Sequence, residues 1–445
     1  MQEFSRRRFM EGSFAALIAR FGFARGESST SESAAGLEPR AKHPTMRSVP
    51  FERKERVRVG IIGTGGRGRS LLGDFIGVPE VDVVALCDIN PAALRAAQGQ
   101  LKQAGRPEAA EYGKSDRDFE NLNARADLDL VIVATPWDWH VPMALHAMTA
   151  GKHVGVEVPA ATTLADCWKL VDTSERTRKH CVILENCCYG ANEMMVLNMC
   201  QQGVFGDITH GEAAYIHDLR GLLFADEGEG LWRRKPHQTR NANLYPTHGL
   251  GPVAQYMGVH RGDRFASIVS MSSAERSLTA FGKKHLKADD PKRQEKYVCG
   301  DMNTSILRTE QGRTIMLQHD VVTPRPYSRH NLIAGTEGTF ADYPARIYLD
   351  SMGDDRWHDV KEFRERYEHP LWKRNGEFVR KYSGHGGMDF IMCFRLIECF
   401  RQGIAPDMDV YDAAAWSAPY PLSEASVRAG GAVQKFPDFT RGNWK

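Results

Sequence analysis

The chain has 445 residues, more than one domain usually holds, so we expect two domains with a hydrophobic core each. Its composition, with 42% hydrophobic and 26% charged residues, is that of a soluble globular protein. A formal net charge of +2 gives no electrostatic footprint for nucleic acid or an anionic membrane surface, so we expect no nucleic-acid partner. Nine scattered cysteines without a C-x-x-C pair favour buried free thiols over a disulfide framework.

The N-terminus does not look like part of the fold. Residues 5–10 read S-R-R-R-F-M and precede a modest apolar stretch and a small-residue region that ends near Gly36. This order resembles a twin-arginine signal, so residues 1–36 are expected to direct export of the folded protein, to the periplasm. Because Arg20 interrupts the apolar stretch and no clean A-x-A site follows, a plain basic tail remains the alternative. Residues 37–56 form a charged linker, and no segment reaches membrane-spanning length, so no membrane insertion is expected.

A glycine-rich turn opens the folded part of the chain. Residues 57–62 form an apolar, β-branched run that predicts a buried strand, and residues 69–76 can continue as a helix. Between them lie Gly63, Gly65 and Gly68, in the G-x-G-x-x-G spacing of dinucleotide-binding turns. Asp88 ends the next apolar run, 20 residues after Gly68, where an acid binds the ribose hydroxyls of NAD. The turn therefore predicts a dinucleotide cofactor, with NAD favoured over NADP.

From residue 57 to about residue 190, strand and helix patterns alternate. Strands are predicted at residues 81–87, 128–134, 153–156 and 181–184, and helices at residues 91–104, 119–123, 141–150 and 164–179. This alternation predicts an α/β fold, a Rossmann-type doubly wound parallel sheet over residues 57–190. Ligands bind such sheets at the carboxyl ends of the strands, so one cleft should collect the polar residues at those ends.

The pattern changes after residue 190. After a helix at residues 193–202, strands are predicted at residues 208–215, 265–271, 304–308, 314–318 and 331–335, with few helices between them. We expect residues 191–445 to form an α+β domain with an open mixed or antiparallel sheet, whose open face covers the cofactor. Residues 228–245 form a polar loop long enough to be functional. A helix is expected at residues 388–402, followed by a largely irregular tail with one helix near residues 422–429.

These motifs resemble a known group of proteins. The runs G-T-G-G-R-G (63–68), C-D (87–88), T-P-W-D-W-H (135–140) and G-K-H (151–153) resemble the superfamily typified by glucose–fructose oxidoreductase and inositol dehydrogenase (Gfo/Idh/MocA). The runs E-V-P (157–159), E-N-C-C-Y-G (185–190), W-R (232–233) and Y-P-T-H-G (245–249) look like its hydrolytic branch, glycoside hydrolase family 109. That family contains NAD-dependent α-N-acetylgalactosaminidases, and the likeness covers nearly the whole chain from Val57 to Lys445.

The resemblance implies two sets of site residues. The cofactor NAD would be bound by Gly63, Gly65, Gly66, Arg67, Gly68, Asp88, Trp137, Asp138, Trp139, His140, Glu157, Val158, Asn186 and Tyr245. The sugar would be bound by Tyr215, Arg233, Tyr245, Pro246, Thr247, His248, Tyr327 and Glu157. Trp139 and His140 could instead be core packing, and Glu157 a satisfied carboxylate at a strand end. Residues 385–389, also matched to the family, would shape the cleft or a subunit contact, and a homo-oligomer is expected.

The resemblance also implies a redox-neutral hydrolysis of terminal N-acetylgalactosaminyl glycans or glycosides, outside the usual two-carboxylate scheme. NAD would remove hydride from C3 of the sugar while His248 takes the hydroxyl proton; the ketone would then acidify the C2 proton, whose loss expels the glycosidic oxygen before water adds and hydride returns. Related dehydrogenases carry lysine where this chain has Val158, so the proton must pass to another group. His248 titrates in the right range for it, unless it is a structural histidine.

Tyr189 is the candidate for the C2 proton or the leaving-group step, with an aromatic lid over the sugar as the alternative. No metal site is expected, because H-G-E (210–212) and C-C (187–188) have no partners at ligand spacing. Two other functions stay open: a sugar dehydrogenase that releases NADH, and a sugar- or nucleotide-sensing protein without turnover.

Overall fold

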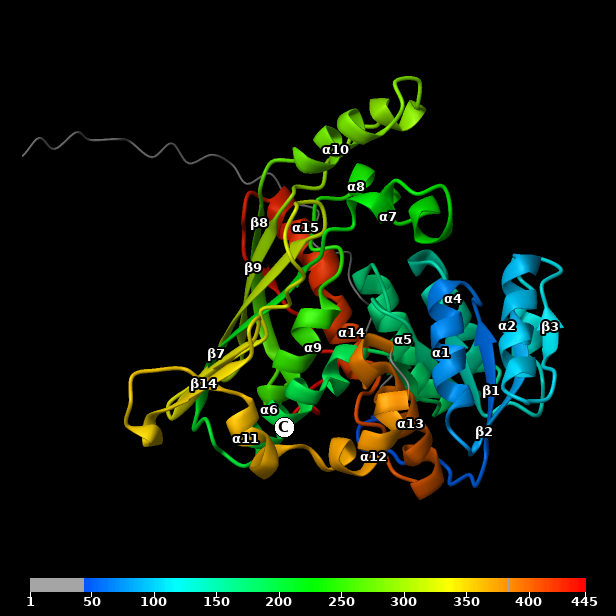
Figure 1. Cartoon of the computed structure of the whole chain (residues 1–445), viewed down its shortest axis with the longest axis horizontal. Coiled ribbons are helices and arrows are strands. Elements are labelled where there is room, and N and C mark those ends of the chain that lie inside the picture. The colour runs from blue at the N-terminus through cyan, green and yellow to red at the C-terminus, as the bar shows by residue number, and fades with distance from the viewer. Residues whose placement is uncertain (1–43, 382–383) are drawn as a thin grey trace, which may run out of the picture. The chain divides into compact units, whose positions relative to one another are not determined.

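The structure is a computed structural model that describes residues 44–381 and 384–445 (Figure 1). The twin-arginine motif and the first part of the linker therefore lie outside the described residues. Within the described part, no helix combines the length and the apolar character needed to cross a bilayer. All nine cysteines fall in this part, and all are free thiols, eight of them buried.

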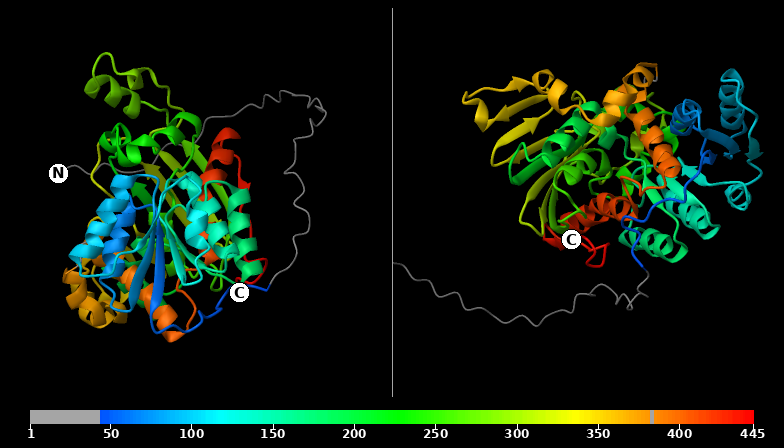
Figure 2. Two further views of the ribbon diagram at one scale, coloured as in Figure 1. Left: turned by 90° about the vertical axis from the view of Figure 1, so that its right-hand side faces the viewer. Right: turned by 90° about the horizontal axis from the view of Figure 1, so that it is seen from below.

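The first sheet has six parallel strands in the order β3-β2-β1-β4-β5-β6, with helices on both of its faces (Figure 2). Its central strands are buried on both faces, which is why they read as unbroken apolar runs in the sequence. The predicted doubly wound sheet is thus confirmed. Its elements are β1 (Val57–Ile62), α1 (Gly66–Ile76), β2 (Val81–Cys87), α2 (Pro91–Gln103), β3 (Ala110–Tyr112), α3 (Phe119–Asn123), β4 (Leu130–Val133), α4 (Trp137–Thr149), β5 (His153–Val156), α5 (Leu164–Thr177) and β6 (Cys181–Ile183).

The second sheet has nine strands in the order β14-β13-β12-β11-β7-β10-β9-β8-β15. Every pairing is antiparallel except that of β7 with β10, so the predicted mixed sheet is confirmed. The strands are β7 (Ile208–Ile216), β8 (Phe265–Ser272), β9 (Asn303–Thr309), β10 (Thr314–Asp320), β11 (Leu332–Gly335), β12 (Gly338–Ala341), β13 (Arg346–Leu349), β14 (His358–Asp359) and β15 (Gln434–Lys435).

Helices complete the second part of the chain. They are α6 (Ala191–Gln201), α7 (Arg220–Leu223), α8 (Lys235–Thr239), α9 (Thr247–Tyr256), α10 (Ser277–His285), α11 (Lys361–Tyr367), α12 (Pro370–Lys381), α13 (Met388–Gln402), α14 (Val410–Ser417) and α15 (Pro419–Arg428). Short 3-10 turns include η1 (Asn186–Tyr189) and η2 (Gly228–Leu231). The helix expected near residues 422–429 is confirmed as α15. Helix α14 was not expected, and Asp409 caps it in a reciprocal capping box.

The expected position of the second sheet's open face is also wrong. Helices α9 and α15 pack on the face that looks toward the first sheet, and the open face points away from it (Figure 1). Close packing of α9 depends on two glycines, since a Cβ on Gly249 would lie 2.4 Å from the backbone nitrogen of Ala214, and one on Gly211 would lie 2.6 Å from Val253. Exposed side chains of Met271 and Ile306 lie on the open face. Helix α9, and not the open face of the second sheet, therefore faces the first sheet.

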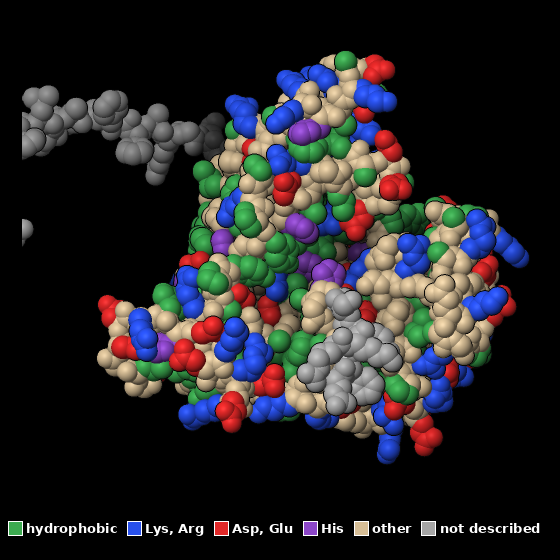
Figure 3. Space-filling view, in the orientation of Figure 1, with side chains coloured by type: hydrophobic (Ala, Val, Ile, Leu, Met, Phe, Trp, Pro, Cys, Tyr) green, Lys and Arg blue, Asp and Glu red, His purple; other side chains and the backbone are tan. Residues whose placement is uncertain are grey.

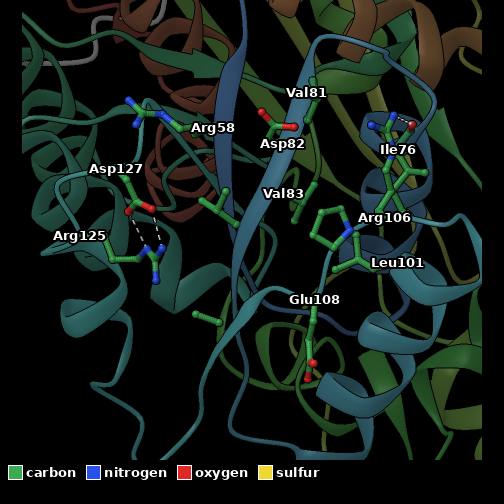
Figure 4. Close-up of a pocket in the computed structure, with 13 residues that line it drawn as sticks. Arg58, Ile76, Val81, Asp82, Val83, Leu101, Arg106, Glu108, Arg125 and Asp127 are labelled. Carbon is green, nitrogen blue, oxygen red and sulfur yellow. Dashed lines mark hydrogen bonds and ion pairs between the residues drawn. The ribbon is translucent and has the colours of Figure 1, made fainter.

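A cavity of about 420 Å³ lies at the amino-terminal halves of β1 and β2 (Figure 4). Among its charged groups, Arg125 pairs with Asp127 and Arg58 with Asp129, and Arg106 donates to the carbonyl of Ile76. Cofactors bind a parallel sheet at the opposite, carboxyl ends of its strands. This cavity is therefore not where the cofactor lies.

Candidate active site

The turn between β1 and α1 has the shape that a dinucleotide requires. Gly63 has a φ of +88°, and a Cβ there would lie 2.5 Å from the carbonyl oxygen of Ala134. A Cβ on Gly68 would lie 1.8 Å from the carbonyl oxygen of Gly63, so this glycine lets helix and strand pack closely. By contrast, nothing lies within 4 Å of a Cβ on Gly65 or Gly66. That open space fronts the N-terminus of α1, where free N–H groups and the helix dipole favour a pyrophosphate.

Asp88 stands beside this turn at the end of β2. Its Oδ2 accepts a hydrogen bond from the Thr64 backbone N–H at 2.7 Å, and its Oδ1 accepts one from the Asn90 backbone N–H at 2.8 Å. Oδ2 also accepts from the Thr64 hydroxyl at 3.2 Å, whereas Oδ1 keeps a second lone pair on a half-buried side chain and can accept from a ribose hydroxyl. The residues of the turn and Asp88 thus fit NAD.

A chain of charged side chains joins the turn to the second part of the molecule. Arg67 donates to Glu157 through Nε, at 2.6 Å, and to Asp389 of α13 through Nη1, at 2.8 Å. Asn186 donates to Oδ1 of the same aspartate at 2.6 Å, and His385 lies 2.7 Å from its Oδ2. Burial raises the pKa of Asp389, but His385 and Arg67 outweigh it and hold that pKa below its usual range. This network orients Glu157 and Asn186 at the carboxyl edge of the first sheet.

His248, the second residue of α9, is held by a carboxylate that the sequence analysis did not assign. Its Nδ1 lies 2.6 Å from Oε1 of Glu185, which is completely buried, whereas the imidazole is 15% exposed. Burial raises the pKa of the Glu185 carboxyl, but His248 and several hydrogen bonds lower it by more. An ionised carboxylate on Nδ1 fixes the tautomer and leaves Nε2 as a proton acceptor. Glu185 lies two residues after the end of β6, and that position near a strand end was the sequence signal for it.

The carboxylate and the imidazole meet because two glycines allow it. A Cβ on Gly251 would lie 3.0 Å from Cγ of Glu185, and the close contact of Gly249 with β7 fixes the start of α9. Sequence analysis read residues 245–249 as a motif and did not predict a helix over Thr247–Tyr256.

Aromatic rings surround His248. The ring centroids of Tyr215 and Tyr245 lie 5.4 Å and 4.9 Å from its imidazole, and those two tyrosines are 4.7 Å apart. The guanidinium of Arg233 lies 4.7 Å from the Tyr245 ring and 5.5 Å from that of Trp137, at the start of α4. These rings and the Arg233 guanidinium form a wall of the site, with residues from both parts of the chain. In the face drawn in Figure 3, histidines gather where the surface is hollowed. Rings and a guanidinium together suit a pyranose with polar substituents.

His217 is a further member of the wall that the sequence analysis missed. The Tyr215 hydroxyl lies 2.9 Å from Nδ1 of His217, and the centroids of the Tyr327 and His217 rings are 5.0 Å apart. Burial, followed by the nearby Arg233, lowers the pKa of His217, so it is neutral at pH 7. Burial also raises the pKa of Tyr215, which keeps its phenol protonated. Tyr327 is 39% exposed and forms the rim of the wall.

Four expected site residues are not arranged as predicted. Both ring nitrogens of His140 face backbone carbonyls, of Pro159 and Thr135 at 2.8 Å each, so neither is left for a cofactor. The half-buried Trp139 packs edge-on against Phe119, between α3 and α4. Both arrangements agree with the core-packing alternative. Thr247 has no exposed surface, which leaves it no face for a sugar.

Tyr189 is the fourth expected site residue that is not arranged as predicted. Its hydroxyl donates to Asp407 at 3.3 Å, and the side chain faces a separate cavity beside α13. Burial, followed by Asp407, raises the pKa of the Tyr189 phenol well above its usual value, so it is not a base near neutral pH. The geometry therefore does not join Tyr189 to His248. Of the other expected residues, Asp138 is exposed in the first turn of α4, while Val158 and Pro246 are buried beside the site.

Metal binding was not expected, and one group of side chains bears on it. Glu185, Cys187 and His248 bring ligand atoms within 4.8 Å of one another. The carboxylate oxygen and imidazole nitrogen bond each other directly, however, which leaves no space for an ion between them. Burial raises the pKa of the Cys187 thiol, which disfavours the thiolate that a metal needs.

Comparison with known proteins agrees with this geometry. Residues 57–185 match the family model "Oxidoreductase family, NAD-binding Rossmann fold", and residues 189–445 match "Glycosyl hydrolase 109, C-terminal domain". The fold resembles that of a levoglucosan dehydrogenase solved in complex with NADH, at a TM-score of 0.67 and 17% identity over 86% of this chain and 100% of that one. An oxidoreductase domain protein from Kribbella flavida, at 18% identity, also has a TM-score of 0.67 over the same shares.

Closer relatives carry the name of the hydrolase family. A glycosyl hydrolase family 109 protein from Solibacter usitatus is 56% identical over 403 residues, which cover 90% of this chain and 92% of that protein. One from Shewanella sp. (strain ANA-3) is 47% identical over 450 residues, which cover 100% of this chain and 98% of that protein. A Rossmann domain that binds NAD thus carries a hydrolase-family domain, and the chain belongs to glycoside hydrolase family 109.

Proposed function

We propose that the chain hydrolyses terminal α-linked N-acetylgalactosamine from glycans or glycosides, without net oxidation or reduction. Family membership and the NAD-binding domain support a glycosidase that depends on this cofactor. The observation that carries the proposal is the pair of His248 and the buried Glu185, 2.6 Å apart at the carboxyl edge of the first sheet. Such a pair suits proton removal from a sugar hydroxyl beside a nicotinamide.

The residues at the carboxyl edge of the first sheet would hold the cofactor. The turn at Gly63–Gly68 suits the pyrophosphate, Asp88 the adenosine ribose, and Glu157 the nicotinamide side. Bound NAD supplies the reversible oxidation of a sugar hydroxyl to a ketone. The rest of the chemistry falls to the side chains of this chain.

His248 accepts the proton of the hydroxyl that is oxidised, and later returns it. Glu185 stabilises the imidazolium and keeps Nε2 directed at the sugar. The buried Val158 has no proton to exchange, so this function cannot fall to the position after Glu157. A ketone makes the adjacent C–H acidic, so a weak base can remove that proton and expel the glycosidic oxygen.

The neighbouring pair of Tyr215 and His217 is the better candidate for the second proton transfer. Its two groups lie 2.9 Å apart, one protonated and one neutral at pH 7, so they can exchange a proton with a bound sugar. The rings of Tyr215 and Tyr245 suit the apolar face of the pyranose, and Arg233 suits its hydroxyl and acetamido oxygens.

A panel of nitrophenyl glycosides, assayed with and without added NAD, tests the proposal. We expect release of nitrophenol from the α-N-acetylgalactosaminide, without net growth of absorbance near 340 nm, and deuterium from the solvent at C2 of the released sugar. Retention of the original hydrogen at C2 would contradict the elimination step. Steady NADH formation with free sugar would instead support a dehydrogenase, and binding without turnover would support a sensing protein.

A further inference from the structure

The proposed hydrolysis needs a proton for the glycosidic oxygen when its bond to C1 breaks. His248 serves the hydroxyl that is oxidised, and the pair of Tyr215 and His217 serves C2. The buried Tyr189 is directed away from the site. The glycosidic oxygen of a terminal sugar lies toward the solvent, because the rest of the glycan extends from it. Its proton donor must therefore be another group, at the exposed side of the site.

The turn at Gly384–Gly387, directly before α13, carries such a group. His385 lies in it with a φ of +44° and a ψ of +45°, the left-handed conformation that most side chains avoid. Gly386 and Gly387 follow with positive φ, and a Cβ on Gly387 would collide with Val379 of α12, so the turn is held closely against that helix. A left-handed residue other than glycine costs about 1–3 kcal/mol, and such residues cluster at active sites.

A buried carboxylate supports His385, as Glu185 supports His248. The Nδ1 of His385 lies 2.7 Å from Oδ2 of Asp389, whose side chain has no exposed surface. Arg67 donates to the same carboxylate at 2.8 Å and Asn186 at 2.6 Å, so three side chains fix its position. An ionised carboxylate on Nδ1 stabilises the imidazolium and holds the ring, and the other ring nitrogen can then transfer a proton.

The other nitrogen of His385 is available for this transfer. The side chain is 63% exposed, against 15% for His248, and no residue in the part of the chain that the structure describes bonds its Nε2. The hydrogen bond to Asp389 raises the pKa of His385, and burial offsets this only in part, so the imidazolium is favoured near pH 7. Burial instead lowers the pKa of His217. His385 is therefore a proton donor, whereas His217 is a neutral acceptor.

Electrostatic interactions place His385 at the site. Its charge interacts with Arg67 and Glu157, at the carboxyl edge of the first sheet. It also interacts with His217, in the aromatic wall, which in turn interacts with His248. Such interactions weaken with distance, so His385 lies near both sides of the site. This agrees with the histidines that gather at the hollow of the surface in Figure 3.

We propose that His385 is the general acid that protonates the glycosidic oxygen, an inference that rests on the proposed hydrolysis. When the C2 proton is removed, its electron pair forms the C1–C2 double bond, and the C1–O bond breaks with its electrons on oxygen. The Nε2 proton of His385 goes to that oxygen, so an alcohol leaves and a neutral imidazole remains. When water adds to C1, Nε2 accepts the proton of the water, and the pair of Tyr215 and His217 returns a proton to C2. Asp389 is a positioning residue, because it acts through the imidazole.

Glycosides with leaving groups of different basicity test this role. A methyl glycoside needs a proton on the departing oxygen, whereas a dinitrophenolate leaves without one. His385→Asn keeps a residue type that tolerates the left-handed conformation but removes the acid. We expect kcat of this variant to fall about 10²-fold or more with methyl α-N-acetylgalactosaminide, and to stay within about fivefold with the dinitrophenyl glycoside. His285→Asn, at the exposed end of α10, is the matched control and should leave both rates unchanged.

Deuterium exchange separates this step from the earlier ones. In heavy water the His385→Asn variant should return unreacted methyl glycoside with deuterium at C2, because oxidation and removal of the C2 proton continue while expulsion is slow. Unchanged rates, an equal loss of rate with both glycosides, or original hydrogen at C2 of the unreacted glycoside would overturn the role of His385. The proposed function would fail differently, since a wild-type chain that binds NAD but cleaves neither glycoside would exclude the hydrolysis, and this role with it.

Discussion

Two helices of this molecule begin at the candidate site, and neither has a side-chain cap at its N-terminus. Helix α1 follows the glycine turn, and its free N–H groups suit a pyrophosphate. Helix α9 follows Pro246 and carries His248 in its first turn. The residues that shape the start of α1 lie within a stretch of twelve residues. His248 at the start of α9 instead needs Glu185, which lies 63 positions earlier in the chain. The glycine turn is thus a local property of the sequence, whereas the pair of Glu185 and His248 depends on the tertiary fold.

The largest effect should follow from a substitution at the start of α9. His248→Ala removes the proton acceptor, so we expect glycosidase activity to fall about 10³-fold, in line with the loss of a general base. The affinity for NAD, measured by fluorescence titration, should stay within about twofold because no residue of the glycine turn changes. Activity that survived His248→Ala would assign proton transfer elsewhere.

A smaller loss of activity is expected from a substitution of Glu185, which contacts His248. Glu185→Gln keeps the size of the side chain but removes the charge that stabilises the His248 imidazolium, so kcat should fall about 10²-fold with little change in KM. The pH–rate profile should also change, since the negative charge that faces the imidazole is lost. A purely structural Glu185 would lower the melting temperature and leave the pH profile of the remaining activity where it was.

Substitutions of the glycines at the start of α1 distinguish their role in packing from their role in binding NAD. Gly68→Ala puts a Cβ 1.8 Å from the Gly63 carbonyl oxygen, so it should destabilise the protein by about 2 kcal/mol and weaken NAD binding. Gly66→Ala puts a Cβ into open space, so it should keep the melting temperature and weaken only NAD, by about tenfold. Gly73→Ala in the middle of α1, also in open space, is the control and should leave the affinity for NAD unchanged. Equal effects at all three glycines would contradict the cradle assigned to this turn.

The smallest effect should come from Asp74, on α1 where it packs against α13. Burial, followed by the charge of Asp389, raises the pKa of Asp74 to about 7. Because its pKa in the folded state is above its unfolded value, the aspartate costs stability as pH rises from about 4 through about 7. Asp74→Asn should therefore stabilise the protein at pH 8 and have no effect at pH 4, as measured by urea unfolding. Equal stabilisation at both pH values would mean that Asp74 does not titrate in this range.

Much of the first half could be predicted from the sequence because its signals are local. Buried parallel strands read as apolar runs, and the glycines of the turn sit at fixed spacing, so the sheet, the turn and Asp88 were all found. The start of α4 at Trp137 was missed, because T-P-W-D-W-H reads as a loop until the helix packs in the cleft.

The second half shows where local signals end. Helix α9 was not predicted, because its glycines and proline disfavour a helix in isolation. Those same glycines stabilise the helix in the fold, since Gly249 and Gly251 allow it to touch β7 and Glu185. Likewise Tyr189 matched the family pattern, but its hydroxyl donates to Asp407, 218 positions later in the chain.

By itself the sequence determined the fold class, the NAD turn and most of the residue types around His248. Only the tertiary structure decided which of those residues meet: Glu185 with His248, Tyr215 with His217, and Arg67 with Glu157 and Asp389. The physical reason is that a turn or a strand is specified by neighbouring residues, whereas a buried proton-transfer pair depends on packing between segments that the chain brings together only when it folds.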